Sequence, residues 1–302
     1  MERVAVVQRG GISTLPKSWI NALVKFMRRR PLGAISLFIL VSMGLIAVFA
    51  PWIAPKDPAS QFSEVVRKYG QSTVGPNREF WFGTDYLARD ILSRIIYGSR
   101  VSLTVAFAAV ALGDGLGGMM GIASGYFGKW IDAITMRIAD ILMAFPLFIL
   151  ALAIVTALGP SLRNVILAIG VAALPRAARI TRSATLSIKE MEYVEAARAI
   201  GAGHARILFL HVTPQTFAPW LVVATSSLGA VILVEASLSF LGLGVPPPAP
   251  SWGNMMSGQV INTFESNPWE LVFPGLALTM TVFAFNLLGD ALRDHLDPRL
   301  KR

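Results

Sequence analysis

The sequence predicts an all-α, polytopic membrane protein with six transmembrane helices. Of its 302 residues, 54% are hydrophobic and only 15% are charged, whereas soluble domains average about a quarter charged. Neutral apolar runs between the charges are long enough to cross the roughly 30 Å hydrocarbon core of a bilayer as helices. Basic residues flank these runs, which is how membrane proteins fix their orientation. The net charge of +9 therefore reflects membrane topology, and no nucleic-acid partner is expected.

The N-terminal segment, residues 1–30, carries seven Lys/Arg against one acidic residue. Its aromatic and aliphatic residues at helical spacing predict an interfacial helix on the cytoplasmic face. A cleaved signal peptide is not expected, because the apolar run that follows is too long and lacks a small-residue cleavage pattern. That run, residues 31–55, contains no charged residue and is the predicted first transmembrane helix. Trp52 lies near its end as an interface anchor.

The largest polar insert, residues 56–98, is predicted to be an extracytoplasmic loop. We expect Thr84 to cap a helix near its end, with Asp85 complementing the helix dipole. The apolar stripe of this helix predicts that it lies on the outer membrane surface; the stripe consists of Ile91, Leu92, Ile95 and Ile96. Residues 99–290 then form the predicted core with five further transmembrane helices, and residues 291–302 form a cytoplasmic tail.

The second span, Val101 to about Phe127, contains glycines at every fourth position: Gly113, Gly117, Gly121 and Gly125. Small residues at this spacing let transmembrane helices pack closely. Asp114 lies within this glycine ladder near mid-membrane, where a charge costs roughly 2.5–3.5 kcal/mol on insertion scales. It is therefore expected to face protein or water. A residue of a translocation path and a carboxyl hydrogen-bonded to a neighbouring helix are both compatible with this position.

The next two spans are less regular. Lys129 to Asp140 is predicted to be a polar turn in which Arg137 pairs with Asp140. The third span follows from Ile141 to Leu162, with a kink expected at Pro146. The fourth, residues 164–175, is too short to cross unless the helix continues past its terminal proline toward residue 185. With it, 19 Lys/Arg lie inside and 8 outside, as the positive-inside rule favours.

The fifth span runs from Val212 to about Gly242 and the sixth from Leu271 to Gly289. Glu235 lies in the outer part of the fifth span and is expected to be shielded from lipid. A structural ion or hydrogen-bond role and contact with a substrate both remain open for this residue.

Between the fourth and fifth spans lies a charged stretch, Met191 to Pro214, that predicts a helix, a glycine turn, a second helix and a proline stop. Charged residues three apart share one face of the first helix: Glu192, Glu195 and Arg198. Gly201 can end that helix in a left-handed conformation, and Pro214 limits the second helix. Such a hairpin suits docking into another protein, although a solvated connecting loop would have the same pattern.

Four stretches resemble known membrane proteins. Glu195-Ala196-Ala197, followed by Gly201, Ile207, His211 and Pro214, resembles the EAA loop of binding-protein-dependent ABC transporter permeases. Three others resemble the dipeptide, oligopeptide and nickel branch, and within it the C-type permease: Phe82–Asp85 with Arg89–Arg94, Glu235–Gly244, and Gly289–Asp294 with Leu296–Arg299. That branch usually has glycine where this chain has Ala88, so the local turn is expected to differ.

The resemblance implies a type I ABC importer permease fold and a peptide substrate, with nickel or another small solute as the alternative. It places the coupling loop at about residues 187–214, where the ATPase-contacting residues would be Glu192, Glu195, Ala196, Ala197, Arg198, Gly201 and Pro214. The implied partners are a second homologous permease in a heterodimer, two ABC ATPases, an extracytoplasmic substrate-binding protein and the lipid bilayer. The implied location is a bacterial or archaeal inner membrane, with both termini cytoplasmic.

No cofactor is expected in this chain. It lacks a P-loop, so the resemblance assigns ATP and Mg²⁺ to the partner ATPases. Its three histidines lack metal-ligand spacing, and no metal site is expected. Two further classes are weighed against a non-catalytic permease. A secondary transporter would need ion-coupling residues and often repeated halves, and a membrane aspartyl protease would need Asp114 to pair with Asp290.

Overall fold

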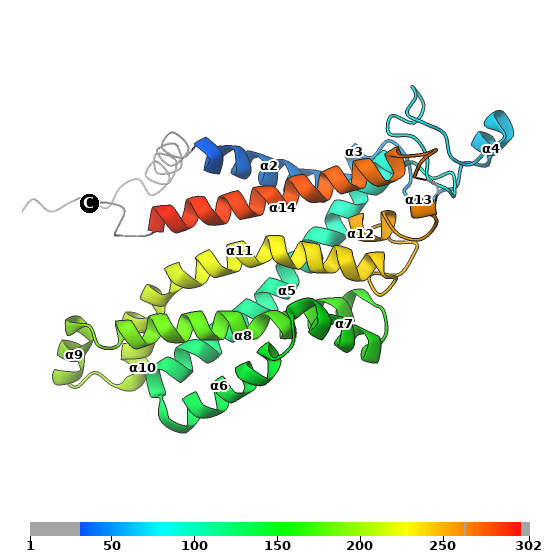
Figure 1. Cartoon of the computed structure of the whole chain (residues 1–302). Coiled ribbons are helices and arrows are strands. Elements are labelled where there is room, and N and C mark those ends of the chain that lie inside the picture. The colour runs from blue at the N-terminus through cyan, green and yellow to red at the C-terminus, as the bar shows by residue number, and fades with distance from the viewer. Residues whose placement is uncertain (1–30, 263, 297–302) are drawn as a thin grey trace, which may run out of the picture.

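Long helices make up the body of the protein (Figure 1), and the computed structural model describes residues 31–262 and 264–296. No β-strand occurs in this described part, which has one isolated bridge between Thr84 and Asp90. The elements in chain order are α2 (Pro31–Val48), α3 (Ala50–Ile53), α4 (Ser63–Tyr69), α5 (Ile91–Phe127), α6 (Lys129–Met143), α7 (Leu147–Leu158), α8 (Leu162–Ile188), α9 (Glu192–Ala199), α10 (His204–Ile207), the π-helix η1 (Leu208–Val212), α11 (Thr213–Phe240), α12 (Trp252–Met255), α13 (Gln259–Asn262) and α14 (Trp269–Leu296).

Five of these helical runs are long and apolar enough to cross a membrane, and the bent pair α6–α7 is a sixth candidate. The start of α2, the end of α14 and the short helices α9 and α10 lie at one end of the molecule, while α4, α12 and α13 lie at the other (Figure 1). Five of the six predicted spans are therefore present as long helices in the predicted order, and the bent pair α6–α7 stands in the place of the third. The predicted N-terminal interfacial helix and the last residues of the tail fall outside the described part of the chain.

The glycine ladder packs α5 against α8, as predicted. A Cβ atom at Gly113, Gly117 or Gly121 would collide with a backbone carbonyl oxygen of α8, at Gly170, Leu174 and Ala178 respectively. At Gly125 it would come within 2.8 Å of Cβ of Thr185. The two backbones therefore touch along four helical turns. Small residues are required there because nothing larger than hydrogen fits between the helices.

The outer part of the chain differs from the prediction. No separate amphipathic helix lies before the second span, because α5 begins at Ile91 and continues without a break to Phe127. Its N-cap is Asp90, whose carboxylate accepts a hydrogen bond from Ser93 N at 2.8 Å, and not Thr84. Both Ile91 and Ile96 are buried by protein. The apolar stripe thus packs inside the fold, and the expected boundary at residues 98 and 99 falls within a helix.

The predicted polar turn after α5 is also wrong. Residues from Lys129 onward form the amphipathic helix α6, and Asp140 pairs with Arg179 of α8, 2.7 Å away, and not with Arg137. The third span is more than kinked: α6 and α7 meet at an angle of 87°. Pro146 is the residue before α7, where it does not have to donate to a preceding helical turn.

Prolines lie in both the fourth and the fifth span, and neither proline ends its helix. The helix α8 does continue past Pro175 to Ile188, which makes it 27 residues long, as its crossing required. Pro214 does not stop a helix, because α10, η1 and α11 follow one another without interruption. Pro214 has no N–H to donate to the preceding turn. That turn is a wider π-helical one, in which the Thr213 N–H reaches back to the Leu208 carbonyl oxygen, and the helix continues through the proline. The sixth span, α14, extends beyond both predicted ends and includes Asp290, which is exposed.

Candidate functional site

The helical hairpin α9–α10 is fixed to the ends of α5 and α8 by a small apolar cluster. On α9, Val194 and Ala197 are buried, and on α10 so is Ile207. They pack with Tyr126 of α5 and Ile188 of α8. The spacing of the two buried α9 residues places them on one face. The opposite face is therefore left free, and it carries the exposed residues Glu192, Glu195, Ala196 and Arg198.

Hydrogen bonds add to this attachment. The Tyr126 hydroxyl lies 3.0 Å from Nδ1 of His204, and Lys189 Nζ donates to the Gly125 carbonyl oxygen at 2.9 Å. The second bond satisfies a carbonyl in the last turn of α5. Gly201 connects the two short helices with φ +83°, a left-handed conformation that residues with a Cβ rarely adopt. The hairpin is consequently held as one body with the inner ends of α5 and α8.

Apolar side chains are also exposed around the hairpin. Ile200, beside the glycine turn, is 86% exposed, and Phe209 and Leu210 are 66% and 62% exposed. Ile200 directly follows α9, and Phe209 and Leu210 lie in η1, which follows α10. A mixed surface of exposed apolar and charged residues is typical of protein interaction sites. Of the sequence-predicted contact residues, Ala197 packs inward and Pro214 lies apart at the start of α11, whereas the rest are on or beside this surface.

Asp114 is enclosed by the protein. Its side chain has no exposed surface, and neither carboxylate oxygen has a hydrogen-bond partner among the described residues. Its backbone carbonyl accepts a hydrogen bond from Trp220 Nε1 of α11 at 2.7 Å. This bond joins the backbone of α5 at Asp114 to α11. The role of Asp114 in a translocation path stays a prediction.

Glu235 is buried as completely, but its carboxylate is satisfied. One oxygen accepts from Ser102 Oγ of α5 at 3.1 Å and the other from Ser239 Oγ of α11 at 2.8 Å. Ser251, which caps α12, donates in turn to Ser239 at 3.3 Å. Glu235 thus joins α5, α11 and α12. Of the two roles that the sequence left open, the geometry supports hydrogen bonding, and substrate contact stays a prediction.

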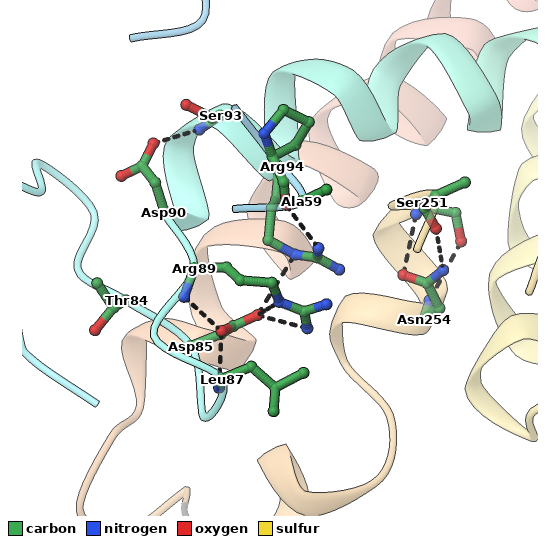
Figure 2. Close-up of polar contacts among 12 residues, drawn as sticks. Ala59, Thr84, Asp85, Leu87, Arg89, Asp90, Ser93, Arg94, Ser251 and Asn254 are labelled. Atoms are coloured by element: carbon green, nitrogen blue, oxygen red, sulfur yellow. Dashed lines mark hydrogen bonds and ion pairs between the residues drawn. The ribbon is translucent and has the colours of Figure 1, made fainter. Parts of the chain in front are cut away.

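A polar cluster at the outer end surrounds the start of α5 (Figure 2). Asp85 accepts from the backbone N–H groups of Leu87 and Arg89 and pairs with the Arg89 guanidinium at 2.7 Å. Arg94 lies 3.5 Å from the same carboxylate and donates to the Pro58 carbonyl oxygen at 3.0 Å. Both arginines are buried, so this cluster ties the loop that precedes α5 to that helix. Ala88 in the loop has φ +56°, which explains why glycine would suit this position.

Two ion pairs between α6 and α8 were not predicted. Arg182 pairs with Asp132 through its Nε and Nη2 atoms, with 2.6 Å for the second contact. The pair of Arg179 with Asp140 lies one turn farther along. The partners are 50 and 39 residues apart in the chain, so sequence spacing could not reveal them. The only available signal was a row of arginines on α8 at three-residue intervals.

Comparison with known proteins agrees with these features. The family described as "Binding-protein-dependent transport system inner membrane component" matches residues 117–302. The chain belongs to this family. The permease also matches, over residues 19–69, the "N-terminal TM domain of oligopeptide transport permease C". These matches confirm the resemblance to C-type permeases.

Curated relatives cover nearly the whole permease. It is 42% identical to the dipeptide transport system permease protein DppC of Alkalihalophilus pseudofirmus over 95% of this chain and 92% of that protein. It is 41% identical to the glutathione transport system permease protein GsiD of Escherichia coli over 94% of this chain and 91% of that protein. The permease is accordingly a multi-pass inner-membrane subunit of an ABC importer, and the relatives are non-catalytic subunits.

Solved structures confirm the fold. An inward-facing MetNI methionine ABC transporter aligns with a TM-score of 0.55 at 20% identity, covering 68% of this chain and 97% of that chain. An amino acid ABC transporter with histidines aligns with a TM-score of 0.53 at 18% identity, covering 68% of this chain and 95% of that chain. The permease therefore has the type I ABC importer architecture predicted for it.

Proposed function

We propose that this permease carries dipeptides or other short peptides. The support is its similarity over nearly the full length to a dipeptide permease and, almost equally, to a glutathione permease. Glutathione is itself a tripeptide, so a short peptide with a free carboxylate is the chemistry common to both. Nickel or another small solute is the alternative that the family resemblance leaves.

The proposed coupling to ATP hydrolysis runs through the α9–α10 hairpin. This proposal depends on one observation: one face of the hairpin packs against the ends of α5 and α8, and the opposite face is exposed. Val194 and Ile207 attach it to the ends of α5 and α8, while Glu195 and Ile200 face outward. An ATPase that grips the exposed face would displace α5 and α8 together. Two packings of the helices, each favoured by one ATPase state, would then give alternating access.

The proposed complex contains a second homologous permease, two ABC ATPases and an extracytoplasmic binding protein. ATP and Mg²⁺ bind to the ATPases, and no cofactor binds to this chain. Both termini are proposed to be cytoplasmic. Supporting this, the start of α2 and the end of α14 lie at the same end of the molecule as the hairpin (Figure 1), and the Lys/Arg distribution favours that end as the cytoplasmic one.

The coupling proposal is tested with Gly201→Val in the reconstituted complex. Nothing lies within 4 Å of a Cβ at this position, so the substitution acts through its φ of +83° and not through a clash. A β-branched residue in this conformation costs about 1–2 kcal/mol. The hairpin should relax to another shape, and peptide uptake per ATP hydrolysed should fall at least severalfold while membrane insertion stays normal.

Gly203→Val is the matched control. Gly203 also has open space around its Cβ, but its φ of −69° and ψ of 159° are ordinary for valine. This variant should therefore transport at close to the wild-type rate. Wild-type transport by Gly201→Val would overturn the coupling role. Proteoliposome uptake of a radiolabelled dipeptide, with glutathione and Ni²⁺ as competitors, tests the substrate.

A further inference from the structure

The inner half of α8 leaves one face uncovered, and that face is polar. Between residues 168 and 188, the exposed residues are Arg176, Arg179, Ser183 and Ser187. Their intervals of three, four and four place them in one stripe along the helix. The side opposite this stripe is the one that packs on the glycine ladder of α5, through Leu174 and Ala178. The stripe therefore faces away from the core of the chain.

Helix faces of this permease that can meet lipid have a different composition. On α14, the exposed residues include Val272, Leu276, Met280 and Phe283, which are 42–58% exposed. Arg176 lies fourteen residues after Leu162, about 21 Å along the axis of α8, and so falls within the roughly 30 Å thickness of the hydrocarbon core. An arginine exposed to lipid at this depth is costly. Arg176 is therefore expected to meet water or protein. Ser183 and Ser187, about 31 and 38 Å along the same axis, lie beyond the hydrocarbon on the same face.

Charge pairing separates Arg176 from the other arginines of α8. Arg179 and Arg182 are each neutralised by an aspartate of α6, Asp140 and Asp132. Arg176, one turn farther out, forms no salt bridge with any residue in the described part of the chain. The helix α6 ends at Met143, where the chain bends toward α7, so it supplies no third aspartate.

One carboxylate that acts on Arg176 from within the chain is enclosed by the protein. Asp114 interacts electrostatically with Arg176, but its carboxylate is buried and makes no hydrogen bond or salt bridge with a described residue. The Arg176 guanidinium thus carries a charge that remains available on an exposed polar face inside the membrane. A guanidinium in such a place binds a carboxylate best, because its planar N–H groups match the two oxygens.

We propose that Arg176 lies on the translocation path and binds the free carboxylate of the passing peptide. Ser183 and Ser187 continue the same polar surface toward the cytoplasmic side. This assignment rests on the proposed peptide substrate. It adds a specificity-determining residue to the permease itself, where the sequence pointed to Asp114 and Glu235. The binding would be transient, since a single guanidinium holds the carboxylate without enclosing the rest of the peptide.

The first test is the accessibility of single cysteines, which is direct because the chain has no native cysteine. Arg176→Cys and Ser183→Cys in the assembled complex should react with a charged, membrane-impermeant methanethiosulfonate reagent. Met280→Cys, on the exposed apolar face of α14, should not. If Arg176→Cys is as unreactive as Met280→Cys, or reacts only in the isolated permease and is covered in the complex, the path assignment is overturned.

The second test measures uptake while one residue of the permease and one chemical group of the substrate are changed, separately and together. Wild type and Arg176→Gln are compared on a dipeptide with a free carboxylate and on its C-terminal amide, with a saturated binding protein. Loss of one charge-assisted contact should lower uptake of the free acid roughly ten- to hundredfold and change uptake of the amide far less. Arg176→Lys should retain part of the preference. Arg163→Gln, at the outer end of α8, should have no such selectivity.

The results separate the two proposals. If the wild-type complex takes up neither peptide, the proposed function fails and the carboxylate assignment falls with it. If wild type transports both peptides and Arg176→Gln lowers both equally, or neither, only the carboxylate assignment is refuted. The binding protein's own preference cancels, because it is the same in the wild-type and variant complexes.

Discussion

The close contact of α5 with α8 makes one substitution especially informative. Replacing Gly117 with alanine places a Cβ against the Leu174 carbonyl oxygen and 3.1 Å from Cβ of Ala177. The first of these neighbours is backbone, so no side-chain rotation relieves the collision. The two helices would have to separate along the ladder, and Gly113 and Gly121 would lose their contacts as well.

The expected magnitude follows from a comparison with Gly115 on the same helix. Nothing lies within 4 Å of a Cβ at Gly115. Both substitutions gain about 1 kcal/mol of helix propensity from alanine, whereas only Gly117→Ala adds a collision, and overpacking typically costs about 1–3 kcal/mol. The difference in unfolding free energy between the variants therefore isolates the packing cost, because the propensity gain cancels.

The difference can be measured by denaturing the detergent-solubilised permease with SDS and following tryptophan fluorescence. Gly117→Ala should be less stable than Gly115→Ala by about 1–3 kcal/mol, and Gly115→Ala should be at least as stable as wild type. Equal stability of the two variants would refute the claim that the ladder brings the two backbones into contact.

Three other outcomes are expected. Glu235→Leu should lower stability by about 1–3 kcal/mol because it leaves the Ser102 hydroxyl without its buried acceptor. Glu235→Gln should be nearly neutral in thermal unfolding. If Glu235→Gln has normal stability but abolishes uptake, the structural role of Glu235 is contradicted. Ala88→Val should destabilise the loop before α5, because φ +56° disfavours a β-branched residue. The effect is measured as faster proteolysis of that loop, and Ala88→Gly should be tolerated. Equal proteolysis of the valine and glycine variants would speak against backbone strain at this position. Asp132→Asn should weaken the pairing with Arg182 and increase hydrogen exchange in α6, and unchanged exchange would show that the pair does not hold that helix.

The number and order of the spans could be predicted because the length of an apolar run has a direct physical meaning in a bilayer. The continuation of α8 past Pro175 could be inferred in the same way, since the shorter run could not cross. The ladder on α5 was visible because a four-residue glycine interval defines one helix face. None of these inferences requires knowing what a residue touches.

Proline effects were harder to predict, because they depend on the position of the residue within its helix. Pro214 reads as a stop in the sequence, yet the helix continues through it from the π-helix η1 into α11. Near Pro146 the chain bends by 87°, and hydropathy gives no direction or angle for a bend. Both Thr84 and Asp90 are acceptable N-caps by residue type, and only the fold selects Asp90.

The polar residues of the candidate site show the same limit. Asp114 and Glu235 stand out in the sequence because each is a charge in an apolar run, but the fold encloses both. Arg176 did not stand out, because it lies at the edge of an apolar run beside other arginines. Which of these residues is exposed depends on the partners of α8, and those partners come from segments more than 60 residues away.

The length of α5 has a mechanical consequence. Its 37 residues extend about 55 Å, well beyond the roughly 30 Å of hydrocarbon. One end is clamped by the buried arginines beside Asp85, and the other carries Tyr126 under the hairpin. A tilt of this single helix would move the loop before α5 and the α9–α10 hairpin in opposite directions at the same moment. Movements of the loop and of the hairpin can thus be coupled directly through α5, without a chain of side-chain rearrangements between them.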